Sequence, residues 1–303
     1  MNTRIHPTLE ELIRLRIEAR GFSLKPRQPV SGLLSGRYAS RLRGRGLIFE
    51  ELRDYRPGDD IRSMDWKATA RLRKPHVRVY SEERERPVLL IVDQRTPMFF
   101  GSARTTKATA ATEVAALAAW RSLDAGDRVG AIIFSDDDVV EIRPHRSSGN
   151  VLRICDELVK ANTKLSAHRP SSDSTSLNDA LLRAINVAKH DHLVLIVTDF
   201  ADADDKTREL TTALAAHNDL IAILVYDPLG ASLPIQAPMR ATDGERQLTL
   251  SGGSDFESLY VNAFRERCDE LRTILRALRV PILPICTHDP ILDQILAALG
   301  RHQ

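Results

Sequence analysis

Carboxylates follow three apolar segments that have the composition of buried strands. Asp93 lies near the end of RPVLLIVDQ, Asp199 near the end of HLVLIVTDF, and Asp227 near the end of DLIAILVYDP. Parallel strands end at one edge of a sheet, so we expect these carboxylates to lie near one another there. They would repel one another without a metal ion, Arg or Lys nearby, which makes this edge the candidate site. The alternative is that each Asp caps the turn after it, and we favour this for Asp227, which precedes Pro228.

The elements that must position these carboxylates alternate between strand-like and helical segments. Continuous apolar runs predict strands buried on both faces, and apolar residues spaced three and four apart predict helices. Strands are expected over residues 86–94, 127–135, 138–144, 192–200, 219–228 and 280–287, and helices over residues 111–123, 151–161, 176–189, 206–217, 256–278 and 290–300. Asp243–Gly244 is a hairpin signal. This order predicts an α/β fold with a mainly parallel sheet and helices on both faces.

Composition indicates an ordinary globular protein. The chain has 303 residues, of which 43% are hydrophobic and 28% are charged. Its apolar runs are far shorter than the ~18 residues that span a bilayer, and the first residues lack the pattern of a signal peptide. The 3 Cys residues are widely spaced, which does not favour a disulfide framework. We therefore expect a cytoplasmic protein of bacterial or archaeal type, with no transmembrane segment.

Basic residues are concentrated near the N-terminus. Residues 1–86 contain 20 Lys or Arg and 12 Asp or Glu, a net charge of +8, whereas the remaining residues contain 23 and 29, a net charge of −6. A basic arm can bind nucleic acid, an anionic membrane or an acidic partner protein. The alternative is a solvated surface whose Arg residues pair with nearby carboxylates. We favour this alternative because like charges never form long blocks.

A segment rich in charges and turn residues lies between residues 46 and 86, and its part from Phe49 to Arg71 has no apolar run: GLIFEELRDYRPGDDIRSMDWKATARLRKPHVRVYSEERER. It resembles the signature of domain-of-unknown-function family 58, whose members are similar to von Willebrand factor A-like proteins and are often encoded beside MoxR-type AAA+ ATPases. The resemblance covers the chain from about residue 36 to its end. It implies a von Willebrand A-like (Rossmann-like) domain over residues 87–303, preceded by an N-terminal extension of residues 1–86 that contains the signature.

The signature segment has two interpretations. Its turn residues, carboxylates and arginines favour a polar network that fixes the segment beside the edge of the sheet. In that network Arg53, Arg56, Arg62 and Arg71 would pair with Asp54, Asp59, Asp60 or Asp65. Its aromatic residues beside Arg are also typical of recognition surfaces. The candidate residues are Arg53, Tyr55, Pro57, Gly58, Asp59, Arg62, Asp65, Trp66, Lys67 and Arg71.

The resemblance also implies an ion site, because von Willebrand A-like domains often carry a metal-ion-dependent adhesion site. That site uses an Asp-x-Ser-x-Ser loop, a Thr from a second loop and an Asp from a third, all hard oxygen ligands that suit Mg²⁺. The resemblance places Asp93, Thr175 and Asp199 at three of these positions.

The first loop departs from that pattern. It reads Asp93-Gln94-Arg95-Thr96-Pro97, so Arg95 and Pro97 replace the two hydroxyls. We therefore expect a degenerate site in which the Arg95 guanidinium substitutes for the metal, with no cofactor or only weakly bound Mg²⁺. Thr96 could shift into register and restore a weak site.

These residues favour a non-catalytic protein-interaction module over an enzyme. The resemblance implies an adaptor or co-chaperone of a MoxR-type AAA+ ATPase, with other von Willebrand A-like proteins as further candidate partners. The contact surface would be the sheet edge with Asp93, Arg95, Thr175 and Asp199. There an acidic residue of the partner would ligate a metal if one is bound, or pair with Arg95 if none is. The alternative is a nucleic-acid-binding protein that uses the basic arm with Tyr38, Tyr55 and Trp66, and we consider it less favoured. A metal-dependent hydrolase built on Asp93 and Asp199 ranks last.

Overall fold

The computed structural model describes residues 5–21, 47–82, 86–167, 175–231, 239–242, 247–250 and 280–299, with part of residues 261–278. It divides into two units, which are described separately: an α/β unit, and a second unit within Ser35–Glu85. No helix in these ranges is both long and apolar enough to cross a membrane.

The α/β unit is built around a sheet with the strand order β10-β7-β6-β3-β4-β5. The strands are β3 (Val88–Gln94), β4 (Val129–Ser135), β5 (Val139–His145), β6 (Leu193–Thr198), β7 (Asp219–Tyr226) and β10 (Ile282–Cys286). All neighbouring strands are parallel except β4 and β5, which form an antiparallel pair. The chain continues from β3 to β4 on one side and later returns to β6 on the other. The strand order therefore reverses at β3, which makes the carboxyl ends of β3 and β6 the topological switch point.

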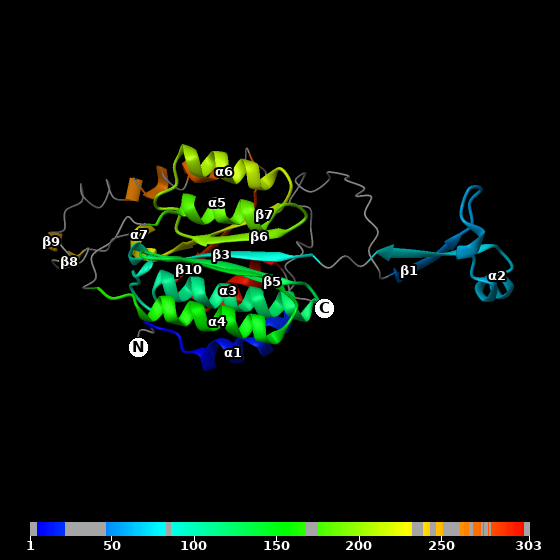
Figure 1. Ribbon diagram of the computed structural model, residues 1–303, viewed down its shortest axis with the longest axis horizontal. Coiled ribbons are helices and arrows are strands. Elements are labelled where there is room, and N and C mark those ends of the chain that lie inside the picture. The colour runs from blue at the N-terminus through cyan, green and yellow to red at the C-terminus, as the bar shows by residue number, and fades with distance from the viewer. Residues whose placement is uncertain are drawn as a thin grey trace. The chain divides into compact units, whose positions relative to one another are not determined.

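Helices cover both faces of this sheet (Figure 1). One face is covered by α3 (Lys107–Asp124), α4 (Ser148–Thr163) and α9 (Ile291–Leu299), and the other by α5 (Leu177–Val187) and α6 (Asp205–Ala215). The helix α1 (Leu9–Glu18) packs on the outer side of α3 and α4 (Figure 1). The alternating side chains of β3 explain the two layers. Leu90 and Val92 belong to the core on the α3 side, and Leu89 and Ile91 to the core on the α5 side. The predicted α/β class, with a mainly parallel sheet and helices on both faces, is confirmed.

Residues 5–21 belong to the α/β unit, which differs from the expected N-terminal extension of residues 1–86. A capping box between Thr8 and Glu11 begins α1. On the inner face of α1, Leu12 is fully buried, and its carbonyl accepts a 2.9 Å hydrogen bond from the Trp120 indole N–H of α3. The guanidinium of Arg16 lies 5.2 Å from the centre of the Trp120 ring. These contacts dock α1 onto α3. The expected extension of residues 1–86 is therefore divided between the α/β unit and the second unit.

The second unit contains the signature segment. Its strands β1 (Leu47–Asp54) and β2 (His76–Glu82) pair antiparallel, with Asp54 opposite His76. The connection between them contains the short helix η2 (Ile61–Ser63) and the helix α2 (Trp66–Leu72). This strand pair was not predicted from the sequence, because charged residues interrupt the apolar pattern of both strands.

The predicted hairpin near the C-terminal third is present as two strands. β8 (Met239–Thr242) and β9 (Gln247–Leu250) pair antiparallel, with Thr242 opposite Gln247. The expected turn at Asp243–Gly244, and much of the expected helix over residues 256–278, lie outside the described residues.

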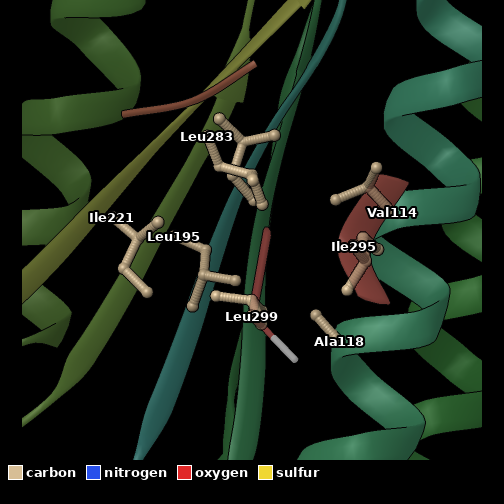
Figure 2. A pocket seen from close by; sticks show the side chains of 8 residues that line it. Val114, Ala118, Leu195, Ile221, Leu283, Ile295 and Leu299 are labelled. Carbon is tan, nitrogen blue, oxygen red and sulfur yellow. The ribbon is translucent and has the colours of Figure 1, made fainter. Parts of the chain in front are cut away.

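A small apolar cavity lies between the sheet, α3 and α9, and Figure 2 shows the side chains that surround it. Its volume is about 20 Å³. The lining residues are Val114, Ala118, Leu195, Ile221, Ile223, Leu283, Ile295 and Leu299. These aliphatic side chains offer no hydrogen bond to a water molecule, so the cavity is a packing gap and not a ligand site.

Candidate functional site

Asp93 and Arg95 form a buried ion pair at the carboxyl end of β3. The Nε and Nη2 atoms of Arg95 donate to the two carboxylate oxygens of Asp93 at 3.0 and 2.7 Å. Oδ2 of Asp93 also accepts a 2.7 Å bond from the hydroxyl of Thr198 on β6. The side chains of Asp93 and Arg95 are 1% and 9% exposed. Both oxygens of Asp93 are therefore satisfied within the chain.

Asp202 is the second partner of Arg95. Its carboxylate oxygens accept bonds of 2.6 and 3.0 Å from Nη1 and Nη2 of Arg95, and Oδ2 also accepts a 3.3 Å bond from the backbone N–H of Leu177. The Arg95 guanidinium also lies 4.9 Å from the centre of the Phe134 ring. The Arg95 guanidinium thus joins the loop after β3 to the loop after β6, and Asp202 links both to the start of α5. The side chain of Asp202 is 37% exposed, so the network meets solvent at this residue.

The environment shifts the pKa of each group in this network. Burial raises the pKa of Asp93, against the opposing effect of the Arg95 hydrogen bonds. For Arg95, burial alone would lower the pKa, but the hydrogen bonds to Asp202 and Asp93 outweigh it and the pKa is raised. Burial also acts to raise the pKa of Asp202, but the Arg95 hydrogen bonds dominate and lower it. Arg95 therefore stays charged throughout the physiological range.

Asp199 lies at the same edge but pairs with a different cation. Its Oδ2 accepts a 2.5 Å bond from Nζ of Lys107, the first residue of α3, and its Oδ1 accepts a 2.9 Å bond from the backbone N–H of Ala201. Asp199 is close enough to Asp93 for its charge to raise the pKa of Asp93. The predicted grouping of Asp93 and Asp199 is therefore present, and each carboxylate has its own cation.

The two threonines of the predicted site lie against the turn between β4 and β5. The backbone N–H of Thr96 donates to Oδ1 of Asp136 at 3.0 Å, and the Thr96 hydroxyl donates to Oδ2 at 2.6 Å. Thr175 donates its hydroxyl to the backbone carbonyl of Ser135. Thr96 and Thr175 therefore anchor loops to neighbouring residues of this turn.

This set of donors does not fit Mg²⁺. A metal in the expected position would need oxygens of Asp93, Thr175 and Asp199 turned toward one point. In the structure the Asp93 oxygens accept from Arg95 and Thr198, and Asp199 pairs with Lys107. Among the described residues there is also no group of three or more His, Cys, Asp or Glu side chains that could hold a metal ion.

Asp227 has a structural role, as the sequence analysis favoured. Its carboxylate accepts hydrogen bonds from the backbone N–H groups of Ser102 and Leu229, both at 2.9 Å, and from the hydroxyls of Ser102 and Thr287. It therefore ties the loop after β7 to two neighbouring loops and does not join the Arg95 network.

Asp202 and Lys107 are the site residues that the sequence analysis missed. Asp202 follows Asp199 by three residues in DFAD, and this was the available signal, because one carboxylate does not satisfy the five N–H donors of a buried guanidinium. The expected pairing of Arg95 with a partner's acidic residue is also not supported, since Asp202 of the same chain occupies that position.

The signature residues support the second unit from within. Arg53 pairs with both oxygens of Asp59 at 2.8 and 2.7 Å, and Asp59 also accepts from the backbone N–H of Arg56. Pro57–Gly58 forms the predicted turn, in which Gly58 has φ of +104°. This part of the expected polar network is present. Whether the unit lies beside the sheet edge stays a prediction.

Asp65 caps α2, and its partner differs from the expected one. Its Oδ1 accepts from the backbone N–H groups of Lys67 and Ala68 at 3.0 and 2.9 Å, and its Oδ2 accepts from Arg78 of β2 at 2.8 Å. The partners expected from the sequence were Arg53, Arg56, Arg62 and Arg71, and Arg78 was not among them. The hairpin brings Arg78 to Asp65 instead.

The fold and the site define an α/β protein whose switch-point edge carries an ion network formed within the chain. The chain belongs to the family described as "Protein of unknown function DUF58", which matches residues 51–266 and thus most of the sequence. Among its relatives are "Uncharacterized protein Mb1516" of Mycobacterium bovis and "Uncharacterized protein Rv1480" of Mycobacterium tuberculosis. Each is 30% identical over 309 residues, which cover 96% of this chain and 93% of the relative. The resemblance to family 58 is confirmed.

Proposed function

We propose that this chain is a non-catalytic protein-interaction module that acts as an adaptor or co-chaperone of a MoxR-type AAA+ ATPase. The observation that supports this proposal is the position of the Arg95 guanidinium between Asp93 and Asp202 at the switch point of the sheet. This is the place where α/β proteins bind ligands or metal ions.

The network argues against a catalytic role for these carboxylates. Asp93 is buried and accepts several hydrogen bonds, so it cannot reach a substrate as a general base. Asp199 is held by Lys107. Neither carboxylate has the accessible position that proton abstraction or metal-assisted hydrolysis requires.

A fixed guanidinium can do the structural work of a metal ion in a degenerate adhesion site. It neutralises a carboxylate at the end of β3 and one in the loop after β6 and holds these segments together, as a divalent ion would, but it is part of the chain. The surface made by the loop after β6 would then be ordered without any ion. We propose that a partner protein binds this ordered edge, and the type of partner follows from the family resemblance.

Titration calorimetry with Mg²⁺ and Mn²⁺ tests the role of the guanidinium. We expect no binding heat from the wild type, because Arg95 holds the Asp93 oxygens. The variant Arg95→Ser with Pro97→Ser restores the two hydroxyls of the adhesion-site pattern, and we expect it to gain binding. Clear stoichiometric binding to the wild type would contradict the substitution of the metal by Arg95.

Affinity purification from the native host, followed by mass spectrometry, tests the partner. The informative variant is Ala201→Arg, which adds a large side chain at an exposed position after β6 and removes no side chain of the Arg95 network. The matched control is Ala213→Arg on an exposed position of α6. We expect the wild type and the control to recover an AAA+ ATPase, and Ala201→Arg to recover less. A wild type that recovers no AAA+ ATPase would refute the adaptor role.

A further inference from the structure

The carboxylates at the turns and caps of the second unit are used to build its fold. Asp59 binds Arg53, Asp60 accepts from the backbone N–H of Arg62 at the start of η2, and Asp65 caps α2 and pairs with Arg78. Each of these carboxylates therefore pairs with an Arg side chain or accepts a hydrogen bond from a backbone N–H group. The cations between Ile61 and Lys74 differ from them.

The segment Ile61–Lys74 carries five exposed cations. Within the part of the second unit that the structure describes, their side chains make no hydrogen bond or ion pair. They are Arg62, Lys67, Arg71, Arg73 and Lys74. The only acidic residue in this segment is Asp65, which is buried and paired. The surface around α2 is therefore strongly positive.

The same segment exposes large apolar side chains among these cations. Trp66 is 66% exposed, Ile61 is 60% exposed and Leu72 is 54% exposed. Exposed tryptophan beside arginine is typical of the residues that contribute most to protein interfaces. Isolated exposed apolar residues need no explanation, but three within twelve residues of one small unit do.

Helix geometry places the indole beside cations. In α2, Lys67 and Arg71 are four residues apart, and so are Trp66 and Ala70, so each pair shares one row of the helix. Consecutive residues lie about 100° apart around the axis, so the two rows are adjacent. All four residues are exposed, whereas Thr69 on the other side accepts a hydrogen bond from the start of β2. The exposed side of α2 therefore combines an aromatic ring, a small residue and two cations. We call this side the α2 face.

We propose that the α2 face binds an acidic segment of a partner protein, in which carboxylates flank a large apolar side chain. The apolar side chain would pack on the Trp66 indole next to Ala70, and the carboxylates would pair with Lys67 and Arg71. This inference rests on the proposed function as an interaction module, and it names the chemistry of the partner. Charge complementarity selects an acidic partner.

Nucleic acid also carries negative charge, but the apolar residues favour a protein. Bases stack on aromatic rings, so Trp66 alone would suit single-stranded nucleic acid. Ile61 and Leu72 have no flat ring to stack on and match the aliphatic side chains of a protein partner. Leu72 lies on the side of α2 away from the α2 face and Ile61 precedes the helix, so these two residues extend the apolar surface of the segment beyond that face. An apolar surface of this extent favours a protein partner.

The emission of Trp66 in the full-length chain reports binding directly. The chain has only 2 Trp residues, and the other, Trp120, is 1% exposed and buried against α1. The probe is a short synthetic peptide of Glu, Leu and Phe, without Trp or Tyr. We expect a saturable blue shift that weakens with salt, because the indole leaves water and the pairing is ionic. A peptide with Lys in place of Glu should give no shift, and Trp66→Phe should abolish the signal.

Charge reversal on the α2 face separates specific binding from attraction to the whole chain. We expect Lys67→Glu with Arg71→Glu to weaken peptide binding about tenfold or more, the ratio that two exposed ion pairs supply. The matched control is Lys206→Glu with Arg208→Glu on α6, which changes the net charge equally and should bind like the wild type. Amide hydrogen exchange in β1 and β2 like that of the wild type confirms that the second unit is folded in the variant.

Three results would overturn the proposal. The first is the absence of a saturable emission shift with the wild type, and the second is tighter binding of an oligothymidylate than of the acidic peptide. The third is Trp66 emission that is already blue-shifted, and protected from iodide quenching, in the unbound chain. The last result would mean that another part of the chain covers the α2 face. None of these results depends on whether an AAA+ ATPase is recovered from the host, so this inference and the adaptor role can fail separately.

Discussion

Replacing Arg95 by methionine removes the cation from the switch-point network and keeps an apolar side chain over Phe134. The variant loses two hydrogen bonds to Asp93 and two to Asp202. Removing one partner of a buried ion pair costs about 3–5 kcal/mol, because the other charge stays buried. Asp93 meets this condition with a side chain that is 1% exposed. Asp202 is 37% exposed, and water can replace Arg95 there, so its share is about 0–1 kcal/mol. We expect a total loss of about 3–6 kcal/mol.

A second variant tests the origin of that loss. Asp93→Asn with Arg95→Met leaves no uncompensated charge at Asp93, so we expect it to be about 2 kcal/mol more stable than Arg95→Met alone. The control is Lys206→Met, which removes an exposed pair with Glu209 and should cost about 0–0.5 kcal/mol. Urea unfolding followed by Trp120 emission, in a Trp66→Phe background, measures all these free energies.

The pH dependence of the single variant supplies an independent check. Burial raises the pKa of Asp93 in the folded chain, and Arg95→Met removes the opposing hydrogen bonds. The folded variant then binds a proton at a pH where the unfolded chain, with a pKa near 3.8, does not. Such a group stabilises the fold below its unfolded pKa and loses this effect as the pH rises, so the deficit of Arg95→Met should shrink toward about pH 4. A loss below about 1 kcal/mol, or a double variant no more stable than the single one, would refute the reasoning.

Three further predictions concern other parts of the molecule. Hydrogen bonds outweigh burial and hold the pKa values of Asp202 and Asp227 below 3.8, so the stability that these carboxylates supply is present above that pH and is lost as the pH falls through their folded pKa values. In urea unfolding measured at several pH values, the variant Asp202→Asn with Asp227→Asn should therefore lose less unfolding free energy on acidification than the wild type. Gly58→Ala should destabilise the second unit by about 1 kcal/mol, because φ of +104° disfavours a Cβ, and amide hydrogen exchange in β1 and β2 should show the loss. Val114→Ile should fill the small cavity beside α9 and raise the free energy of unfolding by about 0.5 kcal/mol, which a lowered melting temperature would contradict.

The sheet and its functional edge could be predicted because the relevant signals are local. The continuous apolar runs at Val88–Gln94 and Leu193–Thr198 indicate buried strands, and a carboxylate at the end of each run indicates the shared edge. The replacement of a hydroxyl by Arg95 in the first loop was also visible in the sequence, so a cation beside Asp93 could be expected.

The ion-pair partners could not be predicted, because they depend on loop conformation. Asp202 reaches Arg95 only because the chain turns sharply after β6, where Phe200 has φ of +53°. Lys107 reaches Asp199 because α3 begins four residues earlier than its apolar pattern predicted. The pairing of β1 with β2 could not be predicted for a similar reason. Its strands carry charges at many positions, and the stabilising contact between Asp65 and Arg78 joins residues that no sequence period connects.

The docking of α1 has a consequence for the order in which the chain can fold during synthesis. Trp120 and Leu12, which form the hydrogen bond between α3 and α1, are separated by 108 positions. The ribosome therefore makes α1, the whole second unit and β3 before the surface that receives α1 exists. The contacts within the second unit span far fewer residues, with Arg53 and Asp59 separated by 6 positions and Asp65 and Arg78 by 13. Short-range contacts form sooner than long-range ones, so the second unit can be complete while α1 still waits for α3. In order of assembly, α1 therefore follows the second unit and α3, although it precedes both in the sequence.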